Sequence, residues 1–150
     1  MLTSSPDPSA CSAIGSETPV PPSGATDVEL LARVRDDDAS AIGALYDRHA
    51  ASELHVACLL CGDGERARQL VEDAFLAIWR RPRMDADVRV SLLGHIDAAA
   101  ARDATLERRC VVLAHAGRLN VAEIGDVVGF TQTVVKRSMR QTLVQDGHRR

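Results

Sequence analysis

The chain of 150 residues has the length of one domain or two small ones, with 45% hydrophobic and 26% charged residues. Its aromatic fraction of only 3% argues against a β-sandwich or β-barrel and favours an all-α protein. The net charge of −3 conceals an asymmetry between the two ends of the chain. Residues 1–105 carry 10 arginines and 17 acids, whereas residues 106–150 carry 8 Lys/Arg and 4 acids. This excess of positive charge is typical of a C-terminal part that binds nucleic acid.

Residues 1–25 are predicted to be a disordered leader. They contain five of the six prolines and six serines, with no hydrophobic period. The first twelve residues lack the basic and apolar parts of a secretory signal, and no apolar run in the chain is long enough to span a membrane. We therefore expect a cytoplasmic protein whose four cysteines are reduced rather than paired in disulfides.

A first helical domain is predicted over residues 26–105. Thr26 and Glu29 have the spacing of a capping box, which indicates that a helix begins there. A second helical pattern follows the three acids at 36–38 and stops at the glycines of 62–64. Three consecutive acids lack the alternate spacing of a calcium loop, so we interpret them as a solvated turn with a helix cap.

Two more helices are expected in this domain. The stretch 65–81 places apolar side chains on one continuous flank, and Pro82 ends it. Trp79 continues that flank, so we interpret it as a packing residue rather than a platform for nucleic-acid bases. A weaker helical pattern covers 90–106 and includes the four alanines of 98–101.

A second helical domain is predicted over residues 106–150. It begins with an apolar-faced helix over 106–116 and contains a helix-turn-helix pattern. Gly125 stands where a helix over 121–128 crosses a final helix that begins at Thr131, and Gly129 lies in the turn between them. The apolar residues at the expected core positions are Ile124, Val128, Phe130 and Val135. We expect Thr131 to cap the final helix and Phe130 to pack onto Val135.

The final helix has two different faces at 100° per residue. Its packing face is predicted to contain Val135, Met139, Thr142 and Leu143. The opposite face presents three cations to DNA, and the alternative is an ordinary solvated helix face. The predicted DNA-binding residues are Thr131, Gln132, Thr133, Lys136, Arg137 and Arg140.

These motifs, in this order, resemble the extracytoplasmic-function sigma factors, and the resemblance covers about residues 27–145. Segments 30–36 and 44–48 resemble the opening of region 2 in that family. Segment 70–80 looks like the helix with which those proteins bind the clamp helices of RNA polymerase, and 121–136 is similar to their region 4, which reads the promoter −35 element. The resemblance implies that the polymerase-binding residues are Gln69, Leu70, Glu72, Asp73, Leu76 and Arg80.

The sequence departs from the family's pattern in three places. The family's promoter-melting helix has a Trp and an Arg-Asn pair, where this chain has Leu92 and the alanines 98–99. Alanine neither stacks on unpaired bases nor binds phosphates. Arg68 and Gln69 replace two acids of the polymerase-binding helix, and the residues 104–105 are nearly all that separates the two predicted domains.

The resemblance implies a transcription initiation protein that binds core RNA polymerase and directs it to promoter DNA. The alternative is a degenerate sigma mimic, an interaction protein that occupies an anti-sigma factor or modulates the polymerase without melting promoter DNA. Its motivation is the alanine run at 98–101. No nucleophile, paired-carboxylate or phosphate-loop pattern indicates an enzyme, and no cofactor is expected.

A rival pattern is formed by His55, Cys58 and Cys61, which could serve a zinc or redox sensor. A structural zinc ion requires a fourth ligand, for which His49 is the candidate. The cysteines fall at a predicted helix C-terminus, where the dipole disfavours the thiolate form that binds metals. We therefore interpret them, together with Cys110, as core cysteines and assign no metal site.

Overall fold

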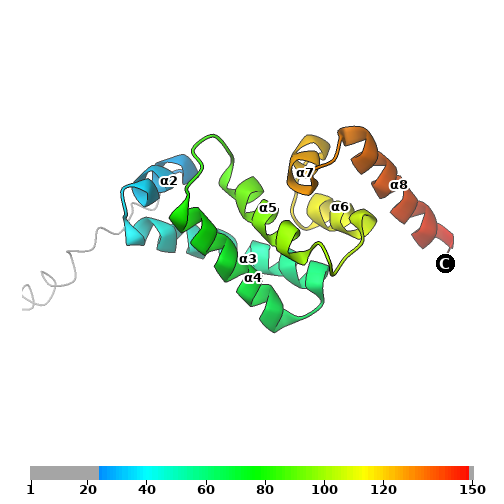
Figure 1. Cartoon of the computed structure of the whole chain (residues 1–150), viewed down its shortest axis with the longest axis horizontal. Coiled ribbons are helices and arrows are strands. Elements are labelled where there is room, and N and C mark those ends of the chain that lie inside the picture. The colour runs from blue at the N-terminus through cyan, green and yellow to red at the C-terminus, as the bar shows by residue number, and fades with distance from the viewer. Residues whose placement is uncertain (1–23, 149–150) are drawn as a thin grey trace, which may run out of the picture.

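The computed structural model describes residues 24–148, which form seven α-helices and no β-strand (Figure 1). The expected all-α fold is therefore confirmed for this part of the chain, whereas the predicted leader lies outside it apart from Gly24 and Ala25. No helix between residues 24 and 148 has both the length and the apolar character to cross a membrane. The helices are α2 (Asp27–Arg35), α3 (Ala39–Cys61), α4 (Gly64–Arg80), α5 (Val88–Ala100), α6 (Leu106–His115), α7 (Val121–Val128) and α8 (Gln132–His148).

Side-chain caps begin the first helices as the sequence predicts. At α2 the backbone N–H of Glu29 donates to Thr26 Oγ1 at 3.2 Å, and the N–H of Thr26 donates to the Glu29 carboxylate at 3.1 Å. At α3 the carboxylate of Asp38 accepts from the N–H of Ser40 at 3.0 Å and from Arg33 Nε at 2.8 Å. The capping box and the acidic helix cap are both confirmed.

One predicted helix boundary is wrong, because the helix expected over 90–106 ends at residue 100, well before the separate helix expected over 106–116. The first of these, α5, ends at Ala100. The second, α6, begins after Thr105, whose hydroxyl accepts from the backbone N–H of Arg108 at 3.3 Å. A threonine cap supplies an acceptor to N–H groups that have no partner at a helix start, so it begins a new helix here. The connection is therefore the segment 101–105.

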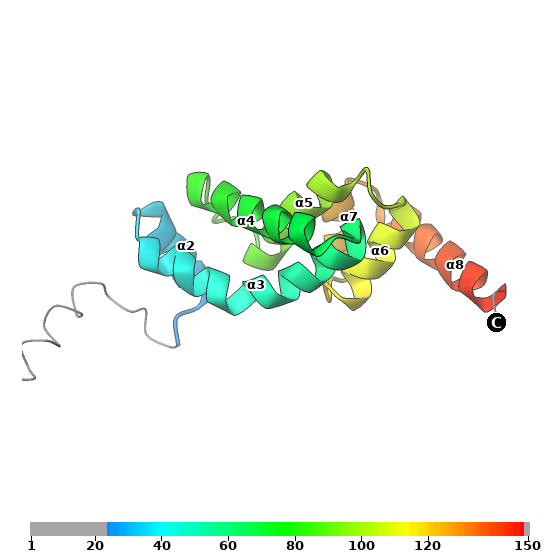
Figure 2. The ribbon, with the colours of Figure 1, turned by 90° about the horizontal axis from the view of Figure 1, so that it is seen from below.

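The longest of these helices, α3, runs along one side of the molecule, and α2, α4 and α5 pack against it (Figure 2). The C-terminal helices follow directly, with α6 on α3 and α7 on α5. The end of α8 extends beyond the other helices (Figures 1 and 2). Residues on both sides of the predicted domain boundary contribute to one buried core. Its largest fully buried apolar side chains are Leu30, Leu45, Leu60, Leu92, Leu93, Ile96, Leu113 and Ile124.

Two neighbouring arginines of α6 also connect the C-terminal helices to the rest of the protein. Arg108 donates from Nε and Nη2 to the backbone carbonyl of Leu59, at 3.1 and 2.7 Å. Arg109 forms an ion pair with Asp97 on α5. The C-terminal helices are thus held by polar contacts as well as by the shared core.

Candidate functional site

The turn between α7 and α8 is built around two glycines. Gly129 ends α7 with a left-handed φ of 78°, and the N–H groups of Gly129 and Phe130 both donate to the carbonyl of Gly125, at 2.9 and 3.1 Å. A Cβ atom on Gly125 would lie 2.8 Å from the Phe130 carbonyl oxygen. Only glycine therefore lets the chain turn back this closely, as the sequence pattern predicts.

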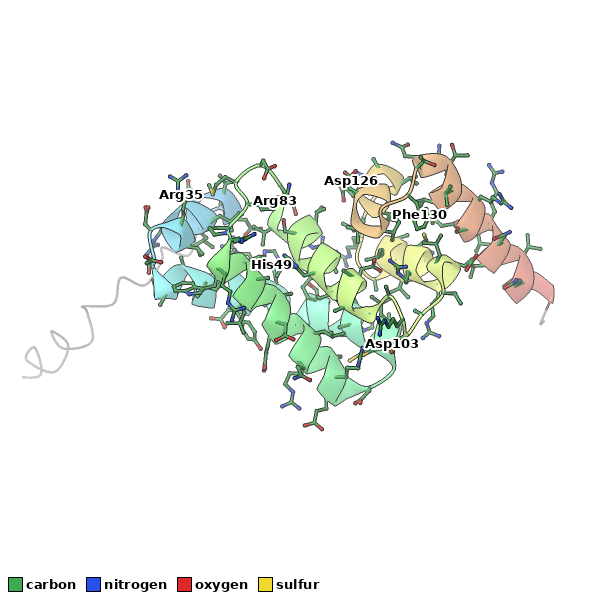
Figure 3. The ribbon with its side chains drawn as sticks, viewed as in Figure 1. Arg35, His49, Arg83, Asp103, Asp126 and Phe130 are labelled. Atoms are coloured by element: carbon green, nitrogen blue, oxygen red, sulfur yellow. The ribbon has the colours of Figure 1, made fainter. Side chains whose placement is uncertain are left out.

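The four apolar residues predicted for the core of this motif are not equally buried. Ile124 and Val135 are fully buried and Val128 is half-buried, as expected. The prediction for Phe130 is wrong, because its side chain is 47% exposed (Figure 3). The turn directs the backbone of Phe130, rather than its ring, against Gly125.

The packing face of α8 is confirmed in its first half only. Val135 and Ser138 are buried, and Met139 and Thr142 are half-buried. Leu143, which the sequence pattern places on the same face, is 65% exposed. That part of the prediction is wrong because the C-terminal end of α8 extends past α6 and finds no neighbour to pack against (Figure 1).

A groove of about 870 Å³ lies between the exposed face of α8 and the start of α6. We call it the basic groove. Four of the six predicted DNA-binding residues line it, and the other two, Thr131 and Gln132, are exposed where α8 begins. The residues that line the basic groove are Thr105, Glu107, Thr133, Lys136, Arg137, Arg140, Gln141, Val144 and Gln145.

The basic groove carries positive charge that the protein itself does not neutralise. Lys136, Arg137 and Arg140 are exposed, and within residues 24–148 none of them forms an ion pair. Glu107 is the acid that lines this groove. Unpaired cations on one helix face attract a polyanion, and phosphates are the groups that such a face binds best.

A second groove, of about 470 Å³, lies between α3 and α4 and is mainly apolar. We call it the apolar groove. Leu76 is 48% exposed and Tyr46 is 39% exposed, which is unusual for large apolar side chains in one patch. The rings of Tyr46 and Phe75 pack at a centroid distance of 5.0 Å and an angle of 57°. The residues that line the apolar groove are Ala39, Ile42, Tyr46, Glu72, Phe75, Leu76 and Trp79.

The six residues that the resemblance assigns to polymerase binding all lie on α4. Five of them are exposed: Gln69, Glu72, Asp73, Leu76 and Arg80. Glu72 and Leu76 also line the apolar groove. Leu70 is 9% exposed and belongs to the core, so its side chain packs inside the protein and is not available to a partner.

The rival metal site is not assembled. His55 is exposed while Cys58 and Cys61 are half-buried. His49, the candidate fourth ligand, instead places Nε2 at 2.9 Å from Oδ2 of Asp27. Among the side chains that the structure describes, no three His, Cys, Asp or Glu residues form a group that could hold a metal ion.

The three cysteines of the described region differ in burial. Cys110 is fully buried, and this burial raises the pKa of its thiol, as expected of a core cysteine. Cys58 and Cys61 pack against the core but stay half-buried, so their predicted burial is only partly correct. The thiol of Cys61 donates to the carbonyl of Asp63 at 3.3 Å.

Sequence reasoning missed a fully buried carboxylate, Glu53, in the middle of α3. Its Oε1 lies 3.7 Å from Nε of Arg89, and its Oε2 has no hydrogen-bond partner. Burial raises the pKa of Glu53 to about 7. The sequence spacing could have revealed it. Glu53 stands three, four and seven residues before the buried Val56, Ala57 and Leu60, and residues at these spacings lie on the same face of a helix.

Comparison of the chain with protein-family models and with curated proteins finds no match. The functional assignment therefore depends on the chemistry of the two grooves. One offers unpaired cations on a helix that follows a glycine turn, and the other offers exposed apolar side chains beside charged ones.

Proposed function

We propose that this protein is a sigma-factor-like transcription protein that binds core RNA polymerase and directs it to promoter DNA. In this proposal α2–α5 act as region 2 and α6–α8 act as region 4, and the protein works in the cytoplasm, where RNA polymerase is found. The observation that carries the proposal is the row of unpaired cations, Lys136, Arg137 and Arg140, on the exposed face of α8.

The DNA-binding half of the proposal follows from how α8 is held. Val135 and Ser138 anchor one face of the helix in the protein, so its opposite face is fixed in position. The three cations would neutralise backbone phosphates, which supply most of the affinity but no sequence information. Polar side chains at the N-terminal end of a recognition helix reach base edges in the major groove. Here those residues are Thr131, Gln132 and Thr133.

The polymerase-binding half of the proposal rests on the apolar groove. Protein interfaces combine a few apolar anchors at the centre with a polar rim. Leu76, Tyr46 and Trp79 provide the anchors, and Glu72 with Arg80 provides charges next to them. An α-helical partner with complementary apolar side chains, such as the clamp helices of the polymerase, fits this surface.

DNA binding tests the first half. Binding of the full chain to a pool of random duplexes is measured at about 50 and about 200 mM salt. The triple variant Lys136→Ala, Arg137→Ala, Arg140→Ala should bind much more weakly. The slope of log affinity against log salt concentration should also become shallower, by up to the equivalent of about three phosphate contacts. The control removes three exposed arginines outside the basic groove, Arg35, Arg68 and Arg102, and should lose little affinity. Equal losses in both triple variants would refute a specific role for α8.

A second candidate function is favoured by one feature of α5. Ala98 and Ala99 are exposed and offer only methyl groups at the positions where the resembled family has Arg and Asn. A protein with this surface could bind the polymerase, or an anti-sigma factor, as a sigma mimic without melting DNA. Run-off transcription separates the two functions, because a mimic binds its partner but yields no specific transcript.

A further inference from the structure

A third cavity, of about 390 Å³, lies where α3 and the start of α5 meet the connection between α6 and α7. We call it the junction cavity. It is distinct from the basic and apolar grooves, with which it shares no lining residue. Three arginines and two histidines surround it, and no acid lines it. Its lining residues are Arg48, His49, Ser52, His55, Arg89, Ala116 and Arg118.

Arg89 has bonding capacity that the protein leaves unused. Its Nη2 donates to the backbone carbonyl of Gly117, which links α5 to the connection after α6. Its buried Nε has no hydrogen-bond partner, because the nearest carboxylate oxygen, on Glu53, is 3.7 Å away. A guanidinium carries five N–H donors, and within the described residues no partner engages Nη1 of Arg89.

Arg118 is held at the edge of the same cavity. Its φ of 55° lies in the left-handed region, which is unfavourable for a residue with a side chain. The residue before it, Gly117, is packed so tightly that a Cβ atom would lie 2.6 Å from the carbonyl oxygen of Leu113. Within residues 24–148, Arg118 has no ion-pair partner although it is exposed. The tight backbone therefore presents an unpaired cation to the cavity.

Two carboxylates behind the cavity limit its positive charge but do not cancel it. Asp27 accepts from Arg48 Nη1 at 2.6 Å and contacts His49 at 2.9 Å, and Glu53 faces Arg89. The three arginines thus outnumber these two acidic groups. His55 is exposed at the cavity and adds a further donor.

We propose that the junction cavity binds the phosphate group of a small molecule. Arg118, Arg89 and His55 would hold the phosphate oxygens, and Arg48, which donates to Asp27 and to the Ala25 carbonyl, would add positive charge beside them. The bound phosphate would bridge α3 to the connection after α6, so it would stabilise the packing of the C-terminal helices. This inference is independent of the proposed DNA and polymerase binding.

The test is calorimetric titration of the full chain with inorganic phosphate and, separately, with glycerol phosphate, against sodium chloride of equal ionic strength. The expected result is saturable binding with a raised unfolding temperature. Arg118→Asn removes the cation while keeping a residue that tolerates left-handed backbone, and should weaken binding about tenfold or more. Arg118→Lys should retain part of the binding, and Arg102→Ala, an exposed arginine elsewhere, should leave it unchanged.

Each remaining outcome has a defined meaning. Tighter binding of glycerol phosphate than of inorganic phosphate supports a phosphate monoester as the ligand, and the reverse supports free phosphate. Stabilisation of equal size in the wild type and in Arg118→Asn would be the general effect of phosphate on protein surfaces and would overturn the proposal. If Arg118→Asn does not fold, His55→Gln on the exposed side of α3 replaces it, and unchanged binding there would also overturn the proposal.

Discussion

Arg109 on α6 and Asp97 on α5 form a buried, two-point ion pair. Nε donates to Oδ1 at 2.8 Å and Nη2 donates to Oδ2 at 2.5 Å, and the two side chains are only 12% and 1% exposed. The Asp97 carboxylate raises the pKa of Arg109, so the guanidinium stays charged in this buried position. The two helices flank the segment 101–105, and the pair therefore fastens the C-terminal helices to the rest of the protein.

Removing one member of this pair should be costly. Asp97→Asn leaves the Arg109 charge buried without a counterion, and we expect the free energy of unfolding to fall by about 3–5 kcal/mol. Urea denaturation followed by circular dichroism measures the change. Asp85→Asn is the matched control, because the Arg83–Asp85 pair is largely exposed, and it should leave stability unchanged. Equal stability of the two variants would show that the buried pair does not hold the helices together.

Glu53 should make the stability of the protein depend on pH. Burial raises the pKa of Glu53 from 4.5 to about 7. The positive charge of Arg89 lowers this pKa and the negative charge of Asp87 raises it, but burial has the larger effect. The folded protein thus binds this proton more tightly than the unfolded chain does. The resulting stabilisation is complete below pH 4.5 and is lost as the pH rises to about 7.

Glu53→Gln removes this titration. Between pH 4.5 and 7 the unfolding free energy of the wild type should fall relative to that of the variant, by up to about 3 kcal/mol in total. Urea unfolding of both proteins across this pH range measures the difference. Because the two proteins share all their other titrating groups, the difference reports Glu53 alone. Parallel pH profiles would show that Glu53 is not protonated in the folded protein near neutral pH.

The turn before α8 should not tolerate a side chain at Gly125. A Cβ atom there would meet the Phe130 carbonyl oxygen at 2.8 Å, so Gly125→Ala should lower stability by about 1–3 kcal/mol and weaken DNA binding. Gly94→Ala is the control. Apart from its chain neighbours and its own helix backbone, nothing lies within 4 Å of the added Cβ atom. Alanine is also the better helix former, so stability should rise by up to about 1 kcal/mol. Thermal unfolding and duplex binding of both variants check this, and the same shift in both would contradict it.

Local features of this fold were predictable because their causes lie within a few residues. The Thr26–Glu29 capping box and the Asp38 cap depend on side chains that bond the backbone two or three positions away. Gly129 likewise ends α7 through its own left-handed conformation. The end of α5 at Ala100 was missed because the alanines of 98–101 favour a helix on both sides of that end.

Burial was less predictable, because it depends on neighbours that are distant in sequence. Phe130 and Leu143 have apolar side chains at helical spacing, yet the turn and the extended end of α8 leave them exposed. Asp97 and Glu53 are polar but fully buried, since arginines from other helices face them. The cations of α8 could be placed on one face from the sequence, but the opposite wall of the basic groove, formed by α6, could not.

The apolar groove should lose its partner when a charge is placed at its centre. Leu76→Asp puts a carboxylate among Tyr46, Phe75 and Trp79, and burying that charge at an interface is unfavourable. We expect binding to core RNA polymerase to weaken by about tenfold or more. Val28→Asp is the control, because Val28 is an exposed apolar residue on α2 outside the apolar groove, and it should bind as the wild type does.

Direct binding of the purified full chain to bacterial core RNA polymerase, at two salt concentrations, tests the central proposal most directly. We predict saturable binding by the wild type and by Val28→Asp, and strongly weakened binding by Leu76→Asp. The apolar contribution should persist at the higher salt, because salt screens charges rather than apolar contacts. Absence of binding by the wild type, or equal binding by Leu76→Asp, would contradict the sigma-factor-like function.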